Sequence, residues 1–259
     1  MTALANRVAV VTGAGRDRSI GGGIARVLAR HGADVVVNDL AVTDEGLRRV
    51  REIEELGRRA ALLPADVTDP VAVDRLMAET VERMGRLDIV VANAGLCDWQ
   101  TVADLTADLW NRIVGVNLHG AFATCRAAAA VMRARGEGGR IIVTSSVHAQ
   151  MPFVEMGVYG GTKQAIGHLV GVMAREWARD GITVNHIGPG WVASAINDNS
   201  PDFKSPEAQR NVQRIIALGH RAGEPEEMGE AVAYLASDAA SYTTGAYLRV
   251  DGGLVMGPY

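Results

Sequence analysis

The sequence predicts a single-domain α/β protein of the Rossmann type, a doubly wound parallel sheet of about seven strands with helices on both faces. Short runs rich in Val, Ile, Leu and Ala alternate with longer stretches of helical character. Most of these runs are continuously apolar, as is typical of strands covered on both faces. No Pro/Ser-rich linker or block of charge divides the chain, so we expect one domain over residues 1–259.

The runs expected to form strands are residues 8–11, 34–38, 60–63, 87–92, 140–144, 183–187 and 246–250. Between them lie residues that typically begin or end helices. Asp69 and Pro70 predict an N-cap followed by the first helical position. Pro225 and two carboxylates after it predict another first turn, where the helix dipole favours negative charge. The glycines that follow helical stretches and precede strands are expected in the left-handed conformation; they are Gly32, Gly57, Gly85 and Gly181.

Composition argues against several classes of protein. The 26 basic and 30 acidic side chains give a formal charge of −4 and are interspersed, whereas a nucleic-acid binder usually carries a basic stripe. We expect no membrane span and no secretory signal, because long apolar runs are missing. The two cysteines, Cys97 and Cys125, fit a cytoplasmic protein without disulfides or zinc, and Cys125 is expected to be a small buried residue.

The first strand and the residues after it predict a phosphate-binding turn. The strand ends at Gly13, Gly-rich sequence continues to Gly23, and a helical pattern begins at Ile24. Backbone N–H groups of such a turn and of the helix N-terminus bind a pyrophosphate. A strict G-x-G-x-x-G motif that starts at Gly13 would need glycine at position 18, where the sequence has Arg18. An ordinary Gly-rich turn without a ligand is therefore the alternative.

Asp39 follows the second strand, where the dinucleotide fingerprint expects an acid. A carboxylate there accepts hydrogen bonds from the adenosine ribose and repels the 2′-phosphate of NADP. Leu40 supplies no compensating cation, so NAD is favoured as the cofactor. Arg16 and Arg18 could supply one, which leaves NADP open; a capping role for Asp39 is the other alternative.

Further signals then appear in a fixed order along the whole chain. Ser146 precedes Tyr159 by 13 residues, and Tyr159 precedes Lys163 by four. The others are Asp66 and Val67, Asn93-Ala94-Gly95, Asn117, Pro189 and Gly190, and Asp251-Gly252-Gly253. With this set the chain resembles the short-chain dehydrogenase/reductase family over essentially its full length.

The resemblance implies an NAD(P)(H)-dependent oxidoreductase that transfers a hydride between the cofactor and a carbonyl compound or secondary alcohol. It implies a catalytic set of Asn117, Ser146, Tyr159 and Lys163. The implied cofactor-binding residues are Gly13, Arg18, Ser19, Ile20, Asp39, Leu40, Asp66, Val67, Asn93, Ala94, Gly95, Tyr159, Lys163, Pro189, Gly190, Val192 and Ser194.

The turn departs from the family's commonest pattern, because Asp17 and Ser19 stand at two of its glycine positions. With two extra residues the turn looks like that of the enoyl reductase branch. That branch places its Tyr and Lys seven positions apart, and position 166 here is Ile. The spacing therefore favours ordinary carbonyl chemistry, with enoyl reduction as a rival hypothesis.

Tyrosine can donate the proton that an alkoxide needs if its pKa falls toward the working pH. Lys163, one helical turn after Tyr159, is expected to lower that pKa by favouring the phenolate. Ser146 is expected to donate a hydrogen bond to the substrate oxygen. The resemblance implies that Asn117 belongs to a proton relay near Lys163.

The substrate is less well defined. The second half of the chain looks most like the glucose 1-dehydrogenase branch, so a glucose or polyol 1-dehydrogenase is one alternative; a non-catalytic NAD-binding regulator is another. A substrate lid is expected at about 194–217. Its polar residues fit a polyol, although a solvated loop would look the same; they are Asn197, Asp198, Asn199, Asp202 and Lys204.

By family analogy, His148, Gln150, Glu155 and Trp191 line the substrate pocket. The six histidines lack ligand spacing, so no catalytic metal is expected. Two Ala-rich helical segments, 109–135 and 158–179, are apolar over much of their surface. This predicts subunit contacts in a homotetramer, with residues 252–259 joining a second interface.

Overall fold

The computed structural model describes residues 3–197 and 205–256, and its centre is one parallel sheet of seven strands in the order β3-β2-β1-β4-β5-β6-β7. The strands are β1 (Val8–Thr12), β2 (Asp34–Asp39), β3 (Ala60–Pro64), β4 (Ile89–Ala92), β5 (Gly139–Thr144), β6 (Ile182–Pro189) and β7 (Tyr247–Val250). The predicted fold class is thereby confirmed. Leu87 and Asp88 precede β4 instead of opening it, and the Asp88 carboxylate accepts a hydrogen bond from Val8 N at 2.9 Å.

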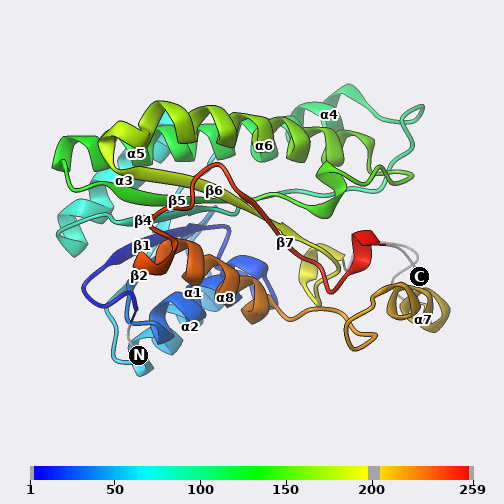
Figure 1. The fold of residues 1–259 in the computed structure, drawn as a ribbon, viewed down its shortest axis with the longest axis horizontal. Coiled ribbons are helices and arrows are strands. Elements are labelled where there is room, and N and C mark those ends of the chain that lie inside the picture. Colours follow the sequence, from blue (N-terminus) through cyan, green and yellow to red (C-terminus); the bar gives the residue numbers. More distant parts are fainter. Residues whose placement is uncertain (1–2, 198–204, 257–259) are drawn as a thin grey trace.

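Helices cover both faces of the sheet (Figure 1). One face carries α1 (Ile20–Arg30), α2 (Asp44–Glu55) and α8 (Pro225–Ala236). The other carries α3 (Pro70–Met84), α4 (Ala107–Val114), α5 (Ala121–Arg135) and α6 (Gly157–Trp177). In Figure 1, α7 (Pro206–Ile215) lies apart from these layers, at the end of the sheet where the strands finish.

The predicted helix starts at Pro70 and Pro225 and the glycines expected after helices are confirmed. Asp69 caps α3 by accepting a hydrogen bond from Val71 N, with Pro70 in the first turn. Glu224 and Glu227 form a capping box at the start of α8. The four glycines expected after helices all have positive φ, between 72° and 100°. These local signals are reliable because each rests on an unsatisfied backbone group or a backbone conformation that few residue types serve.

The predicted start of the first helix at Ile24 is wrong, because α1 begins at Ile20. Ser19 is its N-cap, and its Oγ accepts a hydrogen bond from Gly22 N at 3.0 Å. The glycines that look like loop in the sequence form the first helical turn. A Cβ on Gly23 would lie 2.5 Å from the Pro225 backbone, so close packing of α1 on α8 requires glycine there.

The segment 109–135 is not one regular helix. A π-helical turn, Gly115–Gly120, separates α4 from α5, and it contains Asn117. A π-turn holds one extra residue and is often found at functional sites. The second apolar segment, expected at 158–179, forms α6 over Gly157–Trp177, followed by a short 3₁₀ turn.

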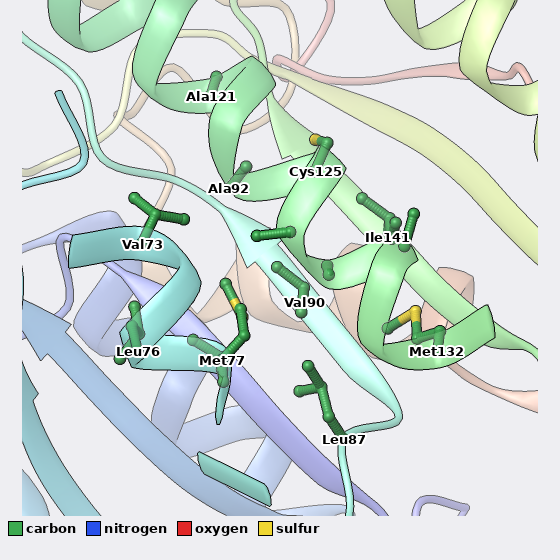
Figure 2. Packing of buried hydrophobic residues seen from close by; sticks show 14 of the residues in the cluster. Val73, Leu76, Met77, Leu87, Val90, Ala92, Ala121, Cys125, Met132 and Ile141 are labelled. Carbon is green, nitrogen blue, oxygen red and sulfur yellow. The ribbon is translucent and has the colours of Figure 1, made fainter. Parts of the chain in front are cut away.

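Buried aliphatic side chains fill both sides of the sheet. Figure 2 shows the side that faces α3 and α5, where Val90 of β4 packs among Met77, Cys125 and Ile141. Cys125 is fully buried, as the sequence predicts. This dense packing fixes the strand ends from which the site is built.

Val90→Ala is expected to lower the free energy of unfolding by about 2–3 kcal/mol, because it removes two buried methyl groups and leaves a cavity. Val90 is 0% exposed, whereas Val71 on α3 is 75% exposed. Val71→Ala is therefore the matched control and should change stability by less than about 0.5 kcal/mol. Denaturant melts of both variants test this; equal losses would contradict the assigned core.

Candidate functional site

The residues singled out from the sequence gather where β1, β4, β5 and β6 end. Because all strands are parallel, their carboxyl ends open onto one edge of the sheet, which is where ligands bind in such folds. The turn after Gly13, the loop from Asn93, Ser146 and Pro189 all lie at this edge.

Asn93 joins three strands at this edge. Its Nδ2 donates to Thr12 O at 2.9 Å, and its Oδ1 accepts from Thr144 Oγ1 at 3.1 Å. Thr12 Oγ1 in turn accepts from the backbone N–H groups of Asn93 and Ala94, both at 3.0 Å. The ends of β1, β4 and β5 are therefore locked together.

The glycine turn lies directly against its neighbours. A Cβ on Gly13 would come within 2.9 Å of Ala94 Cα, and one on Gly15 within 2.9 Å of Asp39 Cβ. The Asp39 carboxylate accepts hydrogen bonds from Gly15 N at 3.0 Å and from Leu40 N at 2.9 Å. Two backbone donors thus orient this carboxylate beside the turn.

A tether between the turn and α2 was not foreseen from the sequence. The Asp17 carboxylate lies 2.5 Å from Arg48 and 4.0 Å from Arg49, which is only 2% exposed. Asp17 N also donates to Glu45 at 3.4 Å. No local pattern signals these contacts, because they join residues about thirty positions apart that only the packing of α2 brings together.

The turn and its surroundings fit a nicotinamide dinucleotide. The N-terminus of α1 presents unsatisfied N–H groups after a close-packed glycine turn, which suits a pyrophosphate. The Asp39 carboxylate at the end of β2 suits ribose hydroxyls.

Further along the edge, Gly190 N donates to Val250 O at 3.0 Å, and Ser194 is buried. Ala195 N donates to Arg18 O at 3.0 Å, so this segment contacts the turn.

The remaining residues implied for the cofactor differ in exposure. Val67 is buried, whereas the exposed Asp66 carboxylate accepts hydrogen bonds from the backbone and hydroxyl of Thr68, both at 2.8 Å. Pro189 ends β6, and Val192 pairs with Gly223 in an isolated bridge. Leu40 is 62% exposed beside Asp39.

Lys163 is a buried cation on α6. It is 4% exposed, and its Nζ donates to Thr144 O at 2.8 Å, at the end of β5. Burial lowers the pKa of Lys163 to about 8, with the Cys97 thiol acting in the opposite direction. Ser145 Oγ donates to Lys163 O at 3.0 Å. The backbone carbonyl and the side-chain ammonium of Lys163 are therefore both hydrogen-bonded near the end of β5.

Tyr159 lies one helical turn earlier, with the Lys163 Nζ 5.7 Å from its ring centroid. Burial raises the pKa of Tyr159 above its usual value, and a side-chain hydrogen bond with Ser146 acts in the opposite direction. Burial dominates this shift, and the lowering expected from the Lys163 ammonium stays a prediction.

Ser146 is held by the loop that follows β5. Its backbone is extended, its Oγ accepts from His148 N at 3.2 Å, and its carbonyl accepts from Tyr247 Oη at 3.0 Å. The hydroxyls of Ser146 and Tyr159 are therefore brought together by contacts from β5, α6 and β7.

Asn117 is fully buried in the π-turn and clamps the loop after β4. Its Oδ1 accepts from Leu96 N at 2.7 Å, and its Nδ2 donates to Leu96 O at 2.8 Å. A Cβ built on Gly95 would lie 3.5 Å from both Asn117 Oδ1 and Lys163 Nζ. Asn117 and Lys163 thus flank the same glycine.

Of the four residues expected to line a substrate pocket, His148 lies beside Tyr159, with their ring centroids 6.3 Å apart. Glu155 has a φ of 67°, and its carbonyl accepts from Gln100 N at 3.1 Å. Gln150 is exposed and Trp191 is partly buried. Four further residues beside this group, Cys97, Trp99, Phe153 and Met156, were missed, because an apolar residue in a loop carries no motif.

The expected lid is described only in part. It contains a short 3₁₀ turn, Ala195–Asn197, and α7, while Asp198, Asn199, Asp202 and Lys204 lie outside the described residues. Asn197 Nδ2 donates to Val192 O at 2.8 Å, so it braces the lid's start.

Among the described residues, no group of three His, Cys, Asp or Glu side chains could hold a metal ion. No helix within the described ranges is long and apolar enough to cross a membrane.

Comparison with known proteins agrees with this geometry. A family model described as enoyl-(acyl carrier protein) reductase matches residues 13–255. L-rhamnose 1-dehydrogenase (NAD(P)(+)) from Sphingomonas sp. (strain SKA58) is 36% identical over 256 residues, which cover 99% of each chain. The 3beta-hydroxysteroid dehydrogenase 1 of Eggerthella lenta is 38% identical over 255 residues, covering 98% of this chain and 96% of that one.

Among solved structures, a putative short-chain alcohol dehydrogenase from Sinorhizobium meliloti 1021 superimposes with a TM-score of 0.92 at 34% identity, covering 98% of each chain. A gluconate 5-dehydrogenase from Burkholderia cenocepacia J2315, in complex with NADP and tartrate, gives a TM-score of 0.91 at 32% identity, covering 98% of this chain and 97% of that one. The names of these proteins span sugars, steroids and acids.

Proposed function

Because the chain belongs to the short-chain dehydrogenase/reductase family and is an NAD(P)-dependent oxidoreductase of alcohols and carbonyl compounds, we propose that Tyr159 exchanges the proton in its reaction. The observation that carries the proposal is the buried Tyr159, whose ring centroid lies 5.7 Å from Lys163 Nζ on the same face of α6, with Ser146 beside it just after β5.

NAD(P) supplies or accepts the hydride when bound. In the reductive direction the substrate oxygen gains negative charge, and Ser146 Oγ and Tyr159 Oη both donate hydrogen bonds to it. Tyr159 then gives up its proton to form the alcohol. In the oxidative direction the same tyrosine takes the hydroxyl proton.

Lys163 carries its charge below its pKa of about 8. An ammonium on the same face of α6 stabilises the negative charge left on Tyr159 when the proton departs. Asn117 flanks Lys163 across Gly95 and takes part in a proton relay to it. Both residues sit in the interior, where water does not screen their effect.

NAD is the proposed cofactor. The Asp39 carboxylate, aligned by Gly15 N and Leu40 N, suits the 2′- and 3′-hydroxyls of the adenosine ribose and repels a 2′-phosphate. The cofactor residues given above as implied by the family keep those roles as proposals.

The wider assignments are also proposals: a single domain over 1–259 with a lid at 194–217, a cytoplasmic location and a homotetramer. Large apolar side chains on the outer helices support the tetramer, since Trp110, Phe122 and Val172 are between 39% and 50% exposed.

Tyr159→Phe is expected to lower kcat by about 10²–10⁴-fold, since it deletes the proton donor and leaves the ring. NADH affinity should stay within about twofold, because the cofactor turn is untouched. Steady-state kinetics with a ketone and fluorescence titration with NADH give the two readouts. Tyr234→Phe, on the exposed side of α8, is the control. Near-normal turnover of Tyr159→Phe would remove this tyrosine from the mechanism.

Asp39→Asn keeps the side-chain shape and removes its charge. The ratio of kcat/KM with NADP to that with NAD should rise at least about tenfold, which corresponds to roughly 1.4 kcal/mol of lost repulsion. Asp74→Asn, on α3 and exposed, serves as the charge control. An unchanged cofactor ratio would show that Asp39 does not select the cofactor.

A further inference from the structure

Two loops at the substrate edge, residues 97–102 and 153–156, carry six apolar side chains, three of which are exposed. We call this set the apolar rim; its members are Cys97, Trp99, Val102, Phe153, Val154 and Met156. Val102 is 78% exposed, Phe153 54% and Val154 76%. Large apolar side chains that are grouped and exposed mark a surface that binds another apolar surface.

The two loops are fastened to each other. Gln100 N donates to Glu155 O at 3.1 Å, and Cys97 Sγ lies 3.5 Å from Met156 Sδ. The Trp99 and Phe153 rings meet edge to face, with centroids 6.2 Å apart. The two loops therefore pack against each other and form one surface.

The rim is continuous with the proposed proton donor. Phe153 lies 5.6 Å from the His148 ring, and His148 lies 6.3 Å from the Tyr159 ring, centroid to centroid. Cys97 contributes to the electrostatic surroundings of both Tyr159 and Lys163. A molecule whose oxygen reaches Tyr159 has its remaining atoms against this surface.

Two titratable groups of this surface, His148 and Cys97, are neutral at physiological pH. Burial lowers the pKa of His148, whose Nδ1 is 3.2 Å from Met151 O, and raises the pKa of the Cys97 thiol to about 12. The charged neighbours are Asp98 and Glu155. One Asp98 oxygen is occupied by Trp99 N at 2.9 Å. The exposed side chains of Val102, Phe153 and Val154 offer no hydrogen-bond partner to the hydroxyl groups of a sugar.

We infer that the substrates are secondary alcohols on fused or substituted alicyclic rings, together with the matching ketones. This inference rests on the proposed function. An apolar ring removes Phe153, Val154 and Val102 from water on binding, whereas a polyol placed there would lose hydration of its hydroxyls without gaining partners from these three side chains. The inference chooses between the sugar and the steroid chemistry named among the relatives.

The first test compares oxidation of 2-decalol and of L-rhamnose with NAD. The value of kcat/KM should be at least about 100-fold higher for 2-decalol, a difference of roughly 2.7 kcal/mol. A preference for the sugar would overturn the inference and leave the proposed function standing.

The second test removes part of the rim. Phe153→Ala should raise KM for 2-decalol about tenfold, with kcat within about twofold, because it deletes buried contact area and no reacting group. Cyclohexanol, which is too small to cover Phe153 as well as reach Tyr159, should be affected less than about threefold. Tyr242→Ala is the control, since Tyr242 is fully exposed near the start of β7. Equal effects on both alcohols would overturn the role of the rim.

A third measurement separates the two proposals. Tyr159→Phe with NADH should bind 2-decalone saturably, detected through tryptophan fluorescence to which Trp99 contributes, and should not bind L-rhamnose at equal concentration. Binding of the ketone without turnover of 2-decalol by the wild type would refute the proposed function and support the substrate class. Absence of ketone binding would refute the class.

Discussion

The site depends on one buried cation and the carbonyl that holds it. Lys163 is 4% exposed, and its ammonium donates to Thr144 O at 2.8 Å. A charge in the interior is tolerated only when it is paired or hydrogen-bonded, so this contact dictates how α6 lies against the end of β5. Tyr159 is one turn away on the same helix, and it is thereby placed beside Ser146, the second residue after β5. The spacing of the three residues is a consequence of this single docking.

Neighbouring elements complete the same arrangement through buried amides. Asn93 ties the ends of β1, β4 and β5, and Asn117 holds both backbone groups of Leu96. Each amide has two polar ends and meets partners of both kinds, which is why it can be buried at little cost. The π-turn that carries Asn117 is the adjustment that brings its side chain to that loop. The cofactor turn, the proton donor and the substrate edge are thus parts of one hydrogen-bonded frame.

Much of this follows from the sequence, and the exceptions share a cause. Strand positions, helix caps and the Ser146–Tyr159–Lys163 spacing depend on local periodicity and backbone chemistry, and the structure agrees with them. The start of α1, the π-turn and the pairing of Asp17 with Arg48 depend on which distant elements pack together. The raised pKa of Tyr159 was not foreseen for the same reason, because burial is not visible in a motif. The apolar rim could not be predicted from the sequence, because its members come from two loops about fifty residues apart.

Lys163 is a buried ammonium whose pKa burial lowers to about 8, and the rest of the site is arranged around it. The sequence contains only two lysines, Lys163 and Lys204, so ¹³C-lysine NMR resolves them, and Lys163→Arg identifies the signal that is lost. Titration of the wild-type protein should show a Lys163 pKa of about 8. A Lys163 signal that titrates near the ordinary value of about 10.4 would show a solvated lysine and contradict its burial beneath the site.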